Sequence, residues 1–277
     1  MKLAIIGCGY VGSSVAQLWH QAGHEVTVTT TTPKKFAALQ EISSQAVVLT
    51  GNDRESLCQV VANQDAVLLS VASKQRTPEI YRQAYLGTAQ NLVAAIRANP
   101  GVKQVIYTSS YGIINDKSGD IIDETVVVNP NDEFGEILHQ TEQVLLSVPE
   151  TEFKTCIFRL SGIYGSGREL IKIFRRAAGG TRPGMGENYT NWVHLNDIVR
   201  AIDFAKDKQL QGIYHLSSDE YMTMKEFLQR LFAAHNLPSV TWDSSQPSTR
   251  SYNMKLSNQK IKDAGFEFAH PMIEFDL

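Results

Sequence analysis

The sequence predicts an α/β protein whose core is a doubly wound parallel sheet, with a small mixed lobe towards the C-terminal end. Apolar, β-branched runs alternate with amphipathic helical stretches up to about residue 165. The runs are apolar throughout, as expected for strands buried on both faces of a parallel sheet. Beyond them the pattern changes to glycine- and proline-rich loops. We therefore expect residues 1–165 to form the core and residues 166–277 a smaller lobe, interleaved with the last core elements.

The individual elements follow from the same alternation. The runs with strand composition lie at residues 2–6, 25–30, 46–50, 66–71, 105–108, 156–160 and 212–216. The stretches with helical periodicity lie at residues 11–22, 34–41, 54–63, 78–98, 133–147, 196–206 and 223–235. Because most strands are followed by a helix before the next strand, parallel pairing with crossover helices is the arrangement that fits.

Composition excludes several classes of protein. The chain has 277 residues, 43% of them hydrophobic, which is enough for a full core without disulfides. Its net charge of −3 argues against a nucleic-acid partner, because phosphate neutralisation needs a basic surface. Apolar runs are too short for a membrane span. The three cysteines are widely spaced and no signal-peptide pattern is present, so we expect a cytoplasmic protein.

A glycine-rich turn follows the first strand and precedes the first helix. It has the spacing G-x-G-x-x-G and consists of Gly7, Cys8, Gly9, Tyr10, Val11 and Gly12. The first glycine permits the tight turn, the second lets the backbone approach a pyrophosphate, and the third allows close packing of helix on strand. The helix N-terminus then presents its positive dipole end to the anion. The turn therefore predicts a dinucleotide site, and residues 1–165 a dinucleotide-binding core.

The end of the second strand indicates which dinucleotide is bound. An acidic residue there would bind the ribose 2′-hydroxyl of NAD. Instead residues 29–35 read Thr-Thr-Thr-Thr-Pro-Lys-Lys, without a carboxylate. A 2′-phosphate carries nearly two negative charges, which an acid would repel and lysines would not. We therefore expect Thr30, Thr31 and Lys34 to favour NADP, with NAD as the second choice; alternatively, Lys34 and Lys35 are solvated surface lysines.

Six later segments carry short motifs in a fixed order. They are YLGTAQNL at 85–92, VIYTSS at 105–110, FRLSGIYG at 158–165 with Arg168 beyond it, NWVHLNDI at 191–198, GIYHLSSDEYMTMKEF at 212–227, and the tail at 254–262. Together with the glycine turn, the chain resembles the extended short-chain dehydrogenase/reductase family, also called the NAD(P)-dependent epimerase/dehydratase family. The resemblance implies a Rossmann core, a small C-terminal substrate lobe and hydride transfer to or from a nicotinamide cofactor.

The resemblance also implies roles for individual residues. Ser110 stands at the position of the family's catalytic serine, and Tyr111 follows it as a second candidate. Substrate contacts are expected from Arg168, Trp192 and His194. Besides the turn and the residues after the second strand, cofactor contacts are expected from Asp53, Val71, Ala72, Thr108, Ser109, Phe134, Ser161 and Ile163. Because no group of His, Cys, Asp or Glu has the spacing of metal ligands, we expect no metal.

The chain departs from the family at its proton relay. Family members carry Tyr-x-x-x-Lys on the helix after the fifth strand, and the matching positions here are Phe134 and Leu138. Phenylalanine has no proton to exchange, and leucine has no charge to lower a phenol pKa. Glu133 and His139 are the candidate substitutes on that helix, but Glu133 reaches the face of Phe134 only from its edge and His139 does not share it. The alternative is that Phe134, Leu138 and Leu145 simply pack, while His139 and the glutamates face solvent.

Two functions from different classes therefore remain open at this point. The first is an epimerase-like oxidoreductase that acts on a small carbonyl, hydroxyl or nucleotide-sugar-like substrate. The second is a non-catalytic NADP(H)-binding sensor or scaffold, which the loss of the relay would permit. The helices near 80–98 and 133–147 pair between subunits in the family, so we also expect a homodimer.

Overall fold

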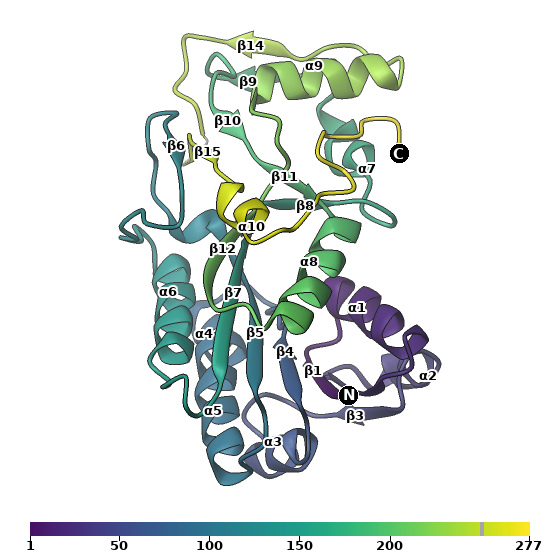
Figure 1. Ribbon diagram of the computed structural model, residues 1–277. Coiled ribbons are helices and arrows are strands. Elements are labelled where there is room, and N and C mark those ends of the chain that lie inside the picture. Colours follow the sequence, from purple (N-terminus) through teal and green to yellow (C-terminus); the bar gives the residue numbers. More distant parts are fainter. Residues whose placement is uncertain (250–251) are drawn as a thin grey trace. The chain divides into compact units, whose positions relative to one another are not determined.

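The structure is a computed structural model that describes residues 1–249 and 252–277 (Figure 1). The chain forms two compact units, and each is built from separate stretches of sequence. The first unit consists of Met1–Ile113, Asn129–Arg159 and Val199–Tyr214. The second consists of Ile114–Val128, Leu160–Ile198 and His215–Leu277.

A seven-stranded sheet is the centre of the fold, in the order β12-β7-β5-β4-β1-β2-β3. Its strands are β1 (Lys2–Ile6), β2 (Glu25–Thr30), β3 (Gln45–Val48), β4 (Ala66–Leu69), β5 (Gln104–Ser110), β7 (Lys154–Leu160) and β12 (Gly212–Leu216). The pairs β1–β2, β2–β3, β1–β4 and β4–β5 run parallel. This order winds outwards in both directions from β1 and confirms the predicted doubly wound sheet.

Both faces of this sheet are buried, as its apolar strands require. Ala4 and Ile6 of β1 join one core, while Leu3 and Ile5, which point the other way, have no exposed surface either. The helices of the sheet are α1 (Tyr10–Gln21), α2 (Phe36–Gln40), α3 (Arg54–Val61), α4 (Pro78–Arg82), α5 (Thr88–Ala98), α6 (Glu133–Leu146) and α8 (Leu195–Lys208) (Figure 1). The core that contains Ala4 and Ile6 is covered by α3, α5 and α6.

The stretch predicted as one helix over residues 78–98 has a change of pitch in its middle. A π-helical turn at Gln83–Gly87 separates α4 from α5. The Thr88 hydroxyl donates to the Gln83 carbonyl at 3.2 Å, so a side chain engages a helical carbonyl at this point. Such turns occur frequently at functional sites. No residue pattern in the sequence predicts this one.

The second unit contains short strands rather than a large sheet. Four two-stranded pairs are formed by β10 (Tyr189–Thr190) with β13 (Met222–Thr223), β11 (Trp192–His194) with β8 (Gly162–Tyr164), β14 (Thr241–Asp243) with β9 (Thr181–Pro183), and β15 (Lys255–Leu256) with β6 (Ile121–Ile122). Its further helices are α7 (Leu170–Phe174), α9 (Met224–Ala234) and α10 (Gln259–Asp263). Its core is aromatic, with Trp192 stacked on Phe227 at 5.2 Å. Among the described residues, no helix has the length and apolar character needed to span a membrane.

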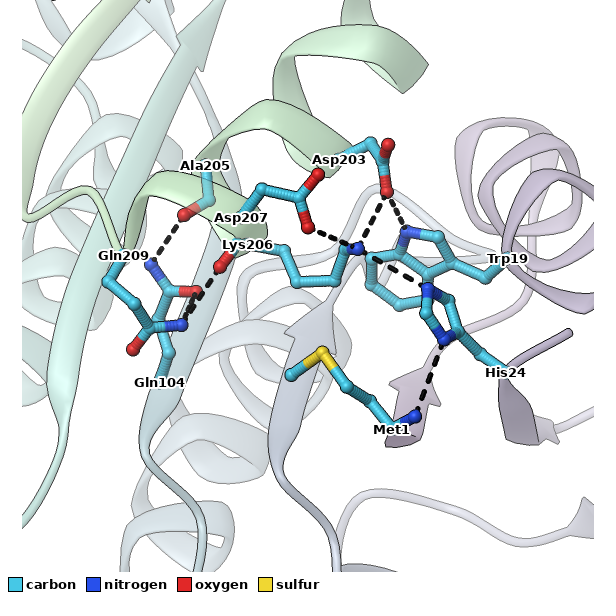
Figure 2. Close-up of polar contacts among 9 residues, drawn as sticks. All are labelled: Met1, Trp19, His24, Gln104, Asp203, Ala205, Lys206, Asp207 and Gln209. Carbon is cyan, nitrogen blue, oxygen red and sulfur yellow. Dashed lines mark hydrogen bonds and ion pairs between the residues drawn. The ribbon is translucent and has the colours of Figure 1, made fainter. Parts of the chain in front are cut away.

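A polar network joins α8 to α1 within the first unit (Figure 2). The indole N–H of Trp19, a residue without exposed surface, donates to Asp203 at 2.8 Å. Lys206 lies between Asp203 at 3.1 Å and Asp207 at 2.6 Å and also contacts His24. Burial and the positive charge of Lys206 lower the pKa of the His24 imidazole, so the neutral ring is favoured there.

A fully buried ion pair joins α6 to β7. The Arg159 guanidinium of β7 bonds the Glu142 carboxylate of α6 at 2.8 Å, and their side chains are 2% and 0% exposed. The Ser109 hydroxyl donates to the same carboxylate at 2.6 Å. A buried charge is tolerated only when its partners satisfy it, so Glu142 holds α6, β5 and β7 in one arrangement.

Removing the indole's acceptor should weaken the first unit. We expect Asp203→Ala to lower the free energy of unfolding by about 1–3 kcal/mol, because it leaves a buried N–H without a partner. Asp207→Ala is the matched control, since Asp207 is 59% exposed and its loss leaves the Asp203 contacts in place. Urea unfolding followed by fluorescence compares the two variants. Equal losses would show that the indole bond contributes nothing specific.

Breaking the buried ion pair should lower the free energy of unfolding by more than Asp203→Ala does. We expect Glu142→Gln to lower the free energy of unfolding by about 3–5 kcal/mol, because Arg159 would remain buried without its counter-charge. Glu152→Gln removes the same charge from the exposed pair with Arg97 and should cost about 1 kcal/mol or less. Urea midpoints measure both. A cost for Glu142→Gln as small as the control's would contradict the role given to this pair.

Candidate functional site

The glycine-rich turn passes very close to the end of β4. Gly7 has φ +93°, a left-handed conformation, and a Cβ on it would lie 2.6 Å from the Ser70 carbonyl oxygen. Two bonds from β2 fix the turn: Gly7 N–H donates to the Thr29 hydroxyl at 3.0 Å, and Cys8 N–H donates to the Thr29 carbonyl at 2.8 Å. No side chain other than hydrogen fits at Gly7.

The other two glycines of the turn differ in their surroundings. A Cβ on Gly12 would lie 2.6 Å from the Gly7 carbonyl oxygen, so α1 packs directly on the turn. A Cβ on Gly9 would meet no protein atom within 4 Å. Gly9 is the residue before α1, and no side chain caps that helix end. This leaves space for an external group in front of the positive end of the helix.

A groove of about 250 Å³ opens in front of the turn, entirely within the first unit. Among its lining residues are seven that the sequence predicted as cofactor contacts: Gly7, Cys8, Gly9, Thr30, Thr31, Val71 and Ala72. The remaining lining residues are Thr32, Lys35, Gly51, Ser70, Ser73, Lys74, Ala84 and Thr88. The groove thus combines backbone, hydroxyl groups and two lysines, and its lining contains no carboxylate.

The two lysines of the groove differ from the one expected from the sequence. Lys35 and Lys74 line it, whereas Lys34 is exposed and is absent from the lining. The charge of Lys35 acts on the Cys8 thiol, which places this ammonium near the glycine turn. Burial is nevertheless the larger effect and raises the pKa of Cys8, so the thiol stays neutral. The sequence holds no signal for Lys74, because it lies in a loop without a motif.

Asp53 has a clear structural task. Its carboxylate accepts hydrogen bonds from the backbone N–H and the hydroxyl of Ser56, at 3.0 and 2.7 Å, and caps α3. These bonds hold the pKa of Asp53 below its usual value. Gly51, two residues earlier, lines the groove instead.

Three hydroxyl groups follow one another at the end of β5, and each has a different partner. The Thr108 hydroxyl donates to that of Ser70 at 3.0 Å, and the Ser109 hydroxyl donates to Glu142. The Ser110 hydroxyl oxygen accepts a bond from the Gly112 N–H at 3.1 Å. That bond does not use the Ser110 proton, which is therefore the one in this row still available for an outside acceptor. Tyr111 opens the short 3₁₀ turn Tyr111–Ile113.

Phe134 and Leu138 have no ionisable group, and both side chains pack against neighbouring residues. The Phe134 ring stands edge-on to Tyr81 at 5.1 Å between ring centres, and the Arg76 guanidinium lies 5.1 Å from its centre. Leu138 is buried. The rings of Tyr81 and Tyr85 lie 4.4 Å apart between their centres, and burial raises the pKa of both phenols. No acid or base that titrates near neutrality occupies the two relay positions.

Tyr10 and Val11 lie in the first turn of α1, and five further predicted site residues lie in the second unit. Ser161 is buried, with its N–H bonded to the Leu216 carbonyl, and Ile163 pairs with Val193 across β8 and β11. Arg168 closes a tight bridge with Gly165. Trp192 is 9% exposed and packs in the aromatic core. Their predicted cofactor and substrate contacts stay predictions.

His194 lies in a cluster that its place in the sequence does not suggest. Its ring stacks on His270 at 3.8 Å, and donor atoms of His194, His270 and Glu274 lie within 4.8 Å of one another. The Nδ1 of His194 accepts from the Asn196 N–H, and the Nδ1 of His270 bonds Glu274 at 2.6 Å. Burial and the neighbouring His270 lower the pKa of His194. Protein partners thus already engage one nitrogen of the His194 ring and both nitrogens of the His270 ring, whose Nε2 lies 3.4 Å from the Asn196 amide nitrogen.

Comparison with known proteins gives concordant results for sequence and fold. Residues 4–216 match the model of the NAD dependent epimerase/dehydratase family. Protein YeeZ of Escherichia coli K12 is 27% identical over 98% of this chain and 96% of its own length. Human epimerase family protein SDR39U1, solved with NADPH, superposes with a TM-score of 0.79 at 17% identity, over 100% of this chain and 97% of its own. MoeE5, solved with UDP-glucose and NAD, gives 0.79 at 17% identity, over 95% and 91%.

The three glycines of the turn should respond differently to one added methyl group. We expect Gly7→Ala and Gly12→Ala each to lower the free energy of unfolding by about 1–3 kcal/mol or more, because a Cβ meets a backbone oxygen. Gly9→Ala should stay within about 0.5 kcal/mol of the unmodified protein, because the added Cβ enters open space. Urea unfolding curves test this order. A large loss for Gly9→Ala would mean that the space in front of α1 is filled by protein.

Proposed function

Because this chain belongs to the NAD-dependent epimerase/dehydratase family, we propose that it is an NADP(H)-preferring oxidoreductase. Its substrate is a small carbonyl, hydroxyl or nucleotide-sugar-like compound. The observation that carries the proposal is the groove at the glycine turn, with open space at Gly9 and two lysines without a carboxylate. Those residues fit a dinucleotide: Gly9 admits the pyrophosphate, and the end of α1 stabilises its charge.

The preference for NADP(H) rests on the residues after β2. Thr30, Thr31 and Lys35 line the groove where NAD-specific members of Rossmann folds place an acid. The 2′-phosphate of NADP carries about −1.5 to −2 charge at neutral pH, which a lysine stabilises. The human relative solved with NADPH has the same fold, while MoeE5 was solved with NAD, so the fold accommodates either cofactor.

The chemistry divides between cofactor and protein. When bound, the nicotinamide supplies the hydride, and the protein supplies position and electrostatics. Phe134 and Leu138 offer no proton. In this proposal the Ser110 hydroxyl, oriented by the Gly112 N–H, donates a hydrogen bond to the substrate oxygen, and Tyr111 or a water exchanges the proton. Without the usual relay a slower reaction is expected, since general acid–base help is typically worth about 10²–10⁴-fold.

A second candidate function has its own supporting observation. Phe134 is built into a packed cluster with Tyr81 and Arg76, at the place where the family keeps its acid. A protein that binds NADP(H) without turning it over, as a sensor or scaffold, would keep the groove and fill the relay positions in this way. Detected turnover would itself exclude this second function, and a Ser110→Ala variant then tests whether Ser110 takes part in the mechanism, because unchanged turnover would remove it.

Two further expectations from the sequence are part of the proposal. The family's helix pairing suggests a homodimer built on α5 and α6, and Val144 and Leu146 of α6 keep partly exposed apolar surface. The three cysteines form no disulfide, which suits a reducing compartment such as the cytoplasm.

Calorimetric titration of the cofactor-stripped protein tests the proposed cofactor. We expect micromolar binding of NADPH, at least about tenfold tighter than that of NADH, since a charge-assisted bond to the 2′-phosphate is worth roughly 1.5–3 kcal/mol. Gly9→Val should remove binding of both cofactors with an unchanged urea midpoint, because its side chain fills the pyrophosphate space.

Three outcomes would decide against parts of this proposal. Equal affinity, or tighter binding of NADH, would overturn the NADP(H) preference and leave the fold assignment intact. Full binding by Gly9→Val would place the pyrophosphate elsewhere. No binding of either cofactor would overturn the proposal as a whole.

A further inference from the structure

The groove at the glycine turn is also lined by a lysine from the loop after β4, Lys74. Lys74 follows β4, whereas Thr31 follows β2, and both line the groove. The Lys74 ammonium donates to the Thr31 carbonyl oxygen at 3.1 Å. A contact between residues 43 positions apart thus ties two loops together at the same groove.

The bond to Thr31 leaves the ammonium with capacity for another partner. A lysine carries three N–H donors, and the Thr31 carbonyl takes one of them. The Thr31 carbonyl is exposed, so the bond competes with water and is weak on its own. An anion placed beside Thr31 would be a stronger acceptor than a neutral carbonyl.

The neighbours of Lys74 favour such an anion. Lys35 lines the same groove from the other loop, and the lining holds no carboxylate that would neutralise the two cations. Two ammonium groups facing one groove repel each other, and a doubly charged phosphate between them relieves that repulsion. Hydroxyls of Thr30 and Thr31 add neutral donors at the same place.

We propose that Lys74 is a specificity-determining residue that binds the ribose 2′-phosphate of NADP(H) together with Lys35, so that the loop after β4 closes over the phosphate. The inference rests on the proposed cofactor binding and adds to it a contact outside the segment after β2. Without cofactor, Lys74 holds the two loops together through Thr31; with it, the ammonium shares its donors with the phosphate.

The deciding experiment measures two cofactors on one set of variants. Lys74→Met keeps the length of the side chain and removes its charge at an exposed position, so folding should be unaffected. We expect it to weaken NADPH binding about tenfold, as one charge-assisted bond is lost, and to change NADH binding less than about twofold. Lys35→Met should behave in the same way.

Two further variants serve as controls. Lys103→Met removes an equal charge just before β5, at the amino end of that strand, away from the groove, and should change neither affinity. Lys34→Met tests the neighbouring lysine outside the lining and should have less effect than Lys74→Met. Adenosine 2′,5′-bisphosphate and AMP are titrated as fragments, and the bisphosphate alone should lose affinity in Lys74→Met.

The outcomes separate this inference from the proposed function. If Lys74→Met weakens NADPH and NADH equally, Lys74 is a loop tether and the inference is wrong, although cofactor binding stands. Unchanged NADPH binding by Lys74→Met also overturns the inference. If the unmodified protein binds neither cofactor nor the bisphosphate, both the proposed function and the inference fail.

Discussion

The close approach of the glycine turn to β4 is the constraint on which the candidate site depends. In this sheet β1 lies between β2 and β4, so the chain winds away from it in two directions. The loops after β1, β2 and β4 must therefore diverge at one edge, and ligands bind in the crevice that this leaves. Gly7 lets the turn touch Ser70, and every lining residue comes from these loops or from the segments beside them. The position of the groove is thus a consequence of strand order, and its chemistry is set by the loops.

The end of β5 keeps defined hydrogen bonds although the two relay positions, Phe134 and Leu138, hold no titratable group. Glu142 and Arg159 form a buried pair that binds the Ser109 hydroxyl, which fixes the strand end whether or not a neighbouring acid exists. Ser110 keeps a defined orientation through the Gly112 N–H. On α6, Phe134 packs against Tyr81 at the position where family members carry the tyrosine of the relay. Structural support of the site and its acid–base chemistry are therefore separable here.

Sequence reasoning succeeded where local pattern and tertiary role coincide. The strands and the three glycines followed from periodicity and spacing, because burial on two faces and a tight turn each demand particular residue types. It could not distinguish residues whose contacts depend on side-chain reach: Lys35 lines the groove while its neighbour Lys34 does not, a difference of one residue at a helix start. Lys74 carries no motif at all. The π-helical turn Gln83–Gly87 and the two-residue strands of the second unit lack any periodic signal of their own.

The discontinuous composition of the first unit has a consequence for how the chain matures on the ribosome. Residues up to 165 supply six strands of the central sheet, whereas α8 and the seventh strand, β12, follow only at residues 195–216. Until they emerge, the Trp19 indole lacks Asp203, and the buried Gln104 amide lacks the Ala205 carbonyl (Figure 2). The same amide also lacks the Leu210 carbonyl. Burying a donor without an acceptor costs free energy, so we expect these donors to stay hydrated on the nascent sheet. The first unit is therefore completed only after residues 114–128 and 160–198 of the second unit have been translated, and a fragment that stops at residue 165 lacks these acceptors.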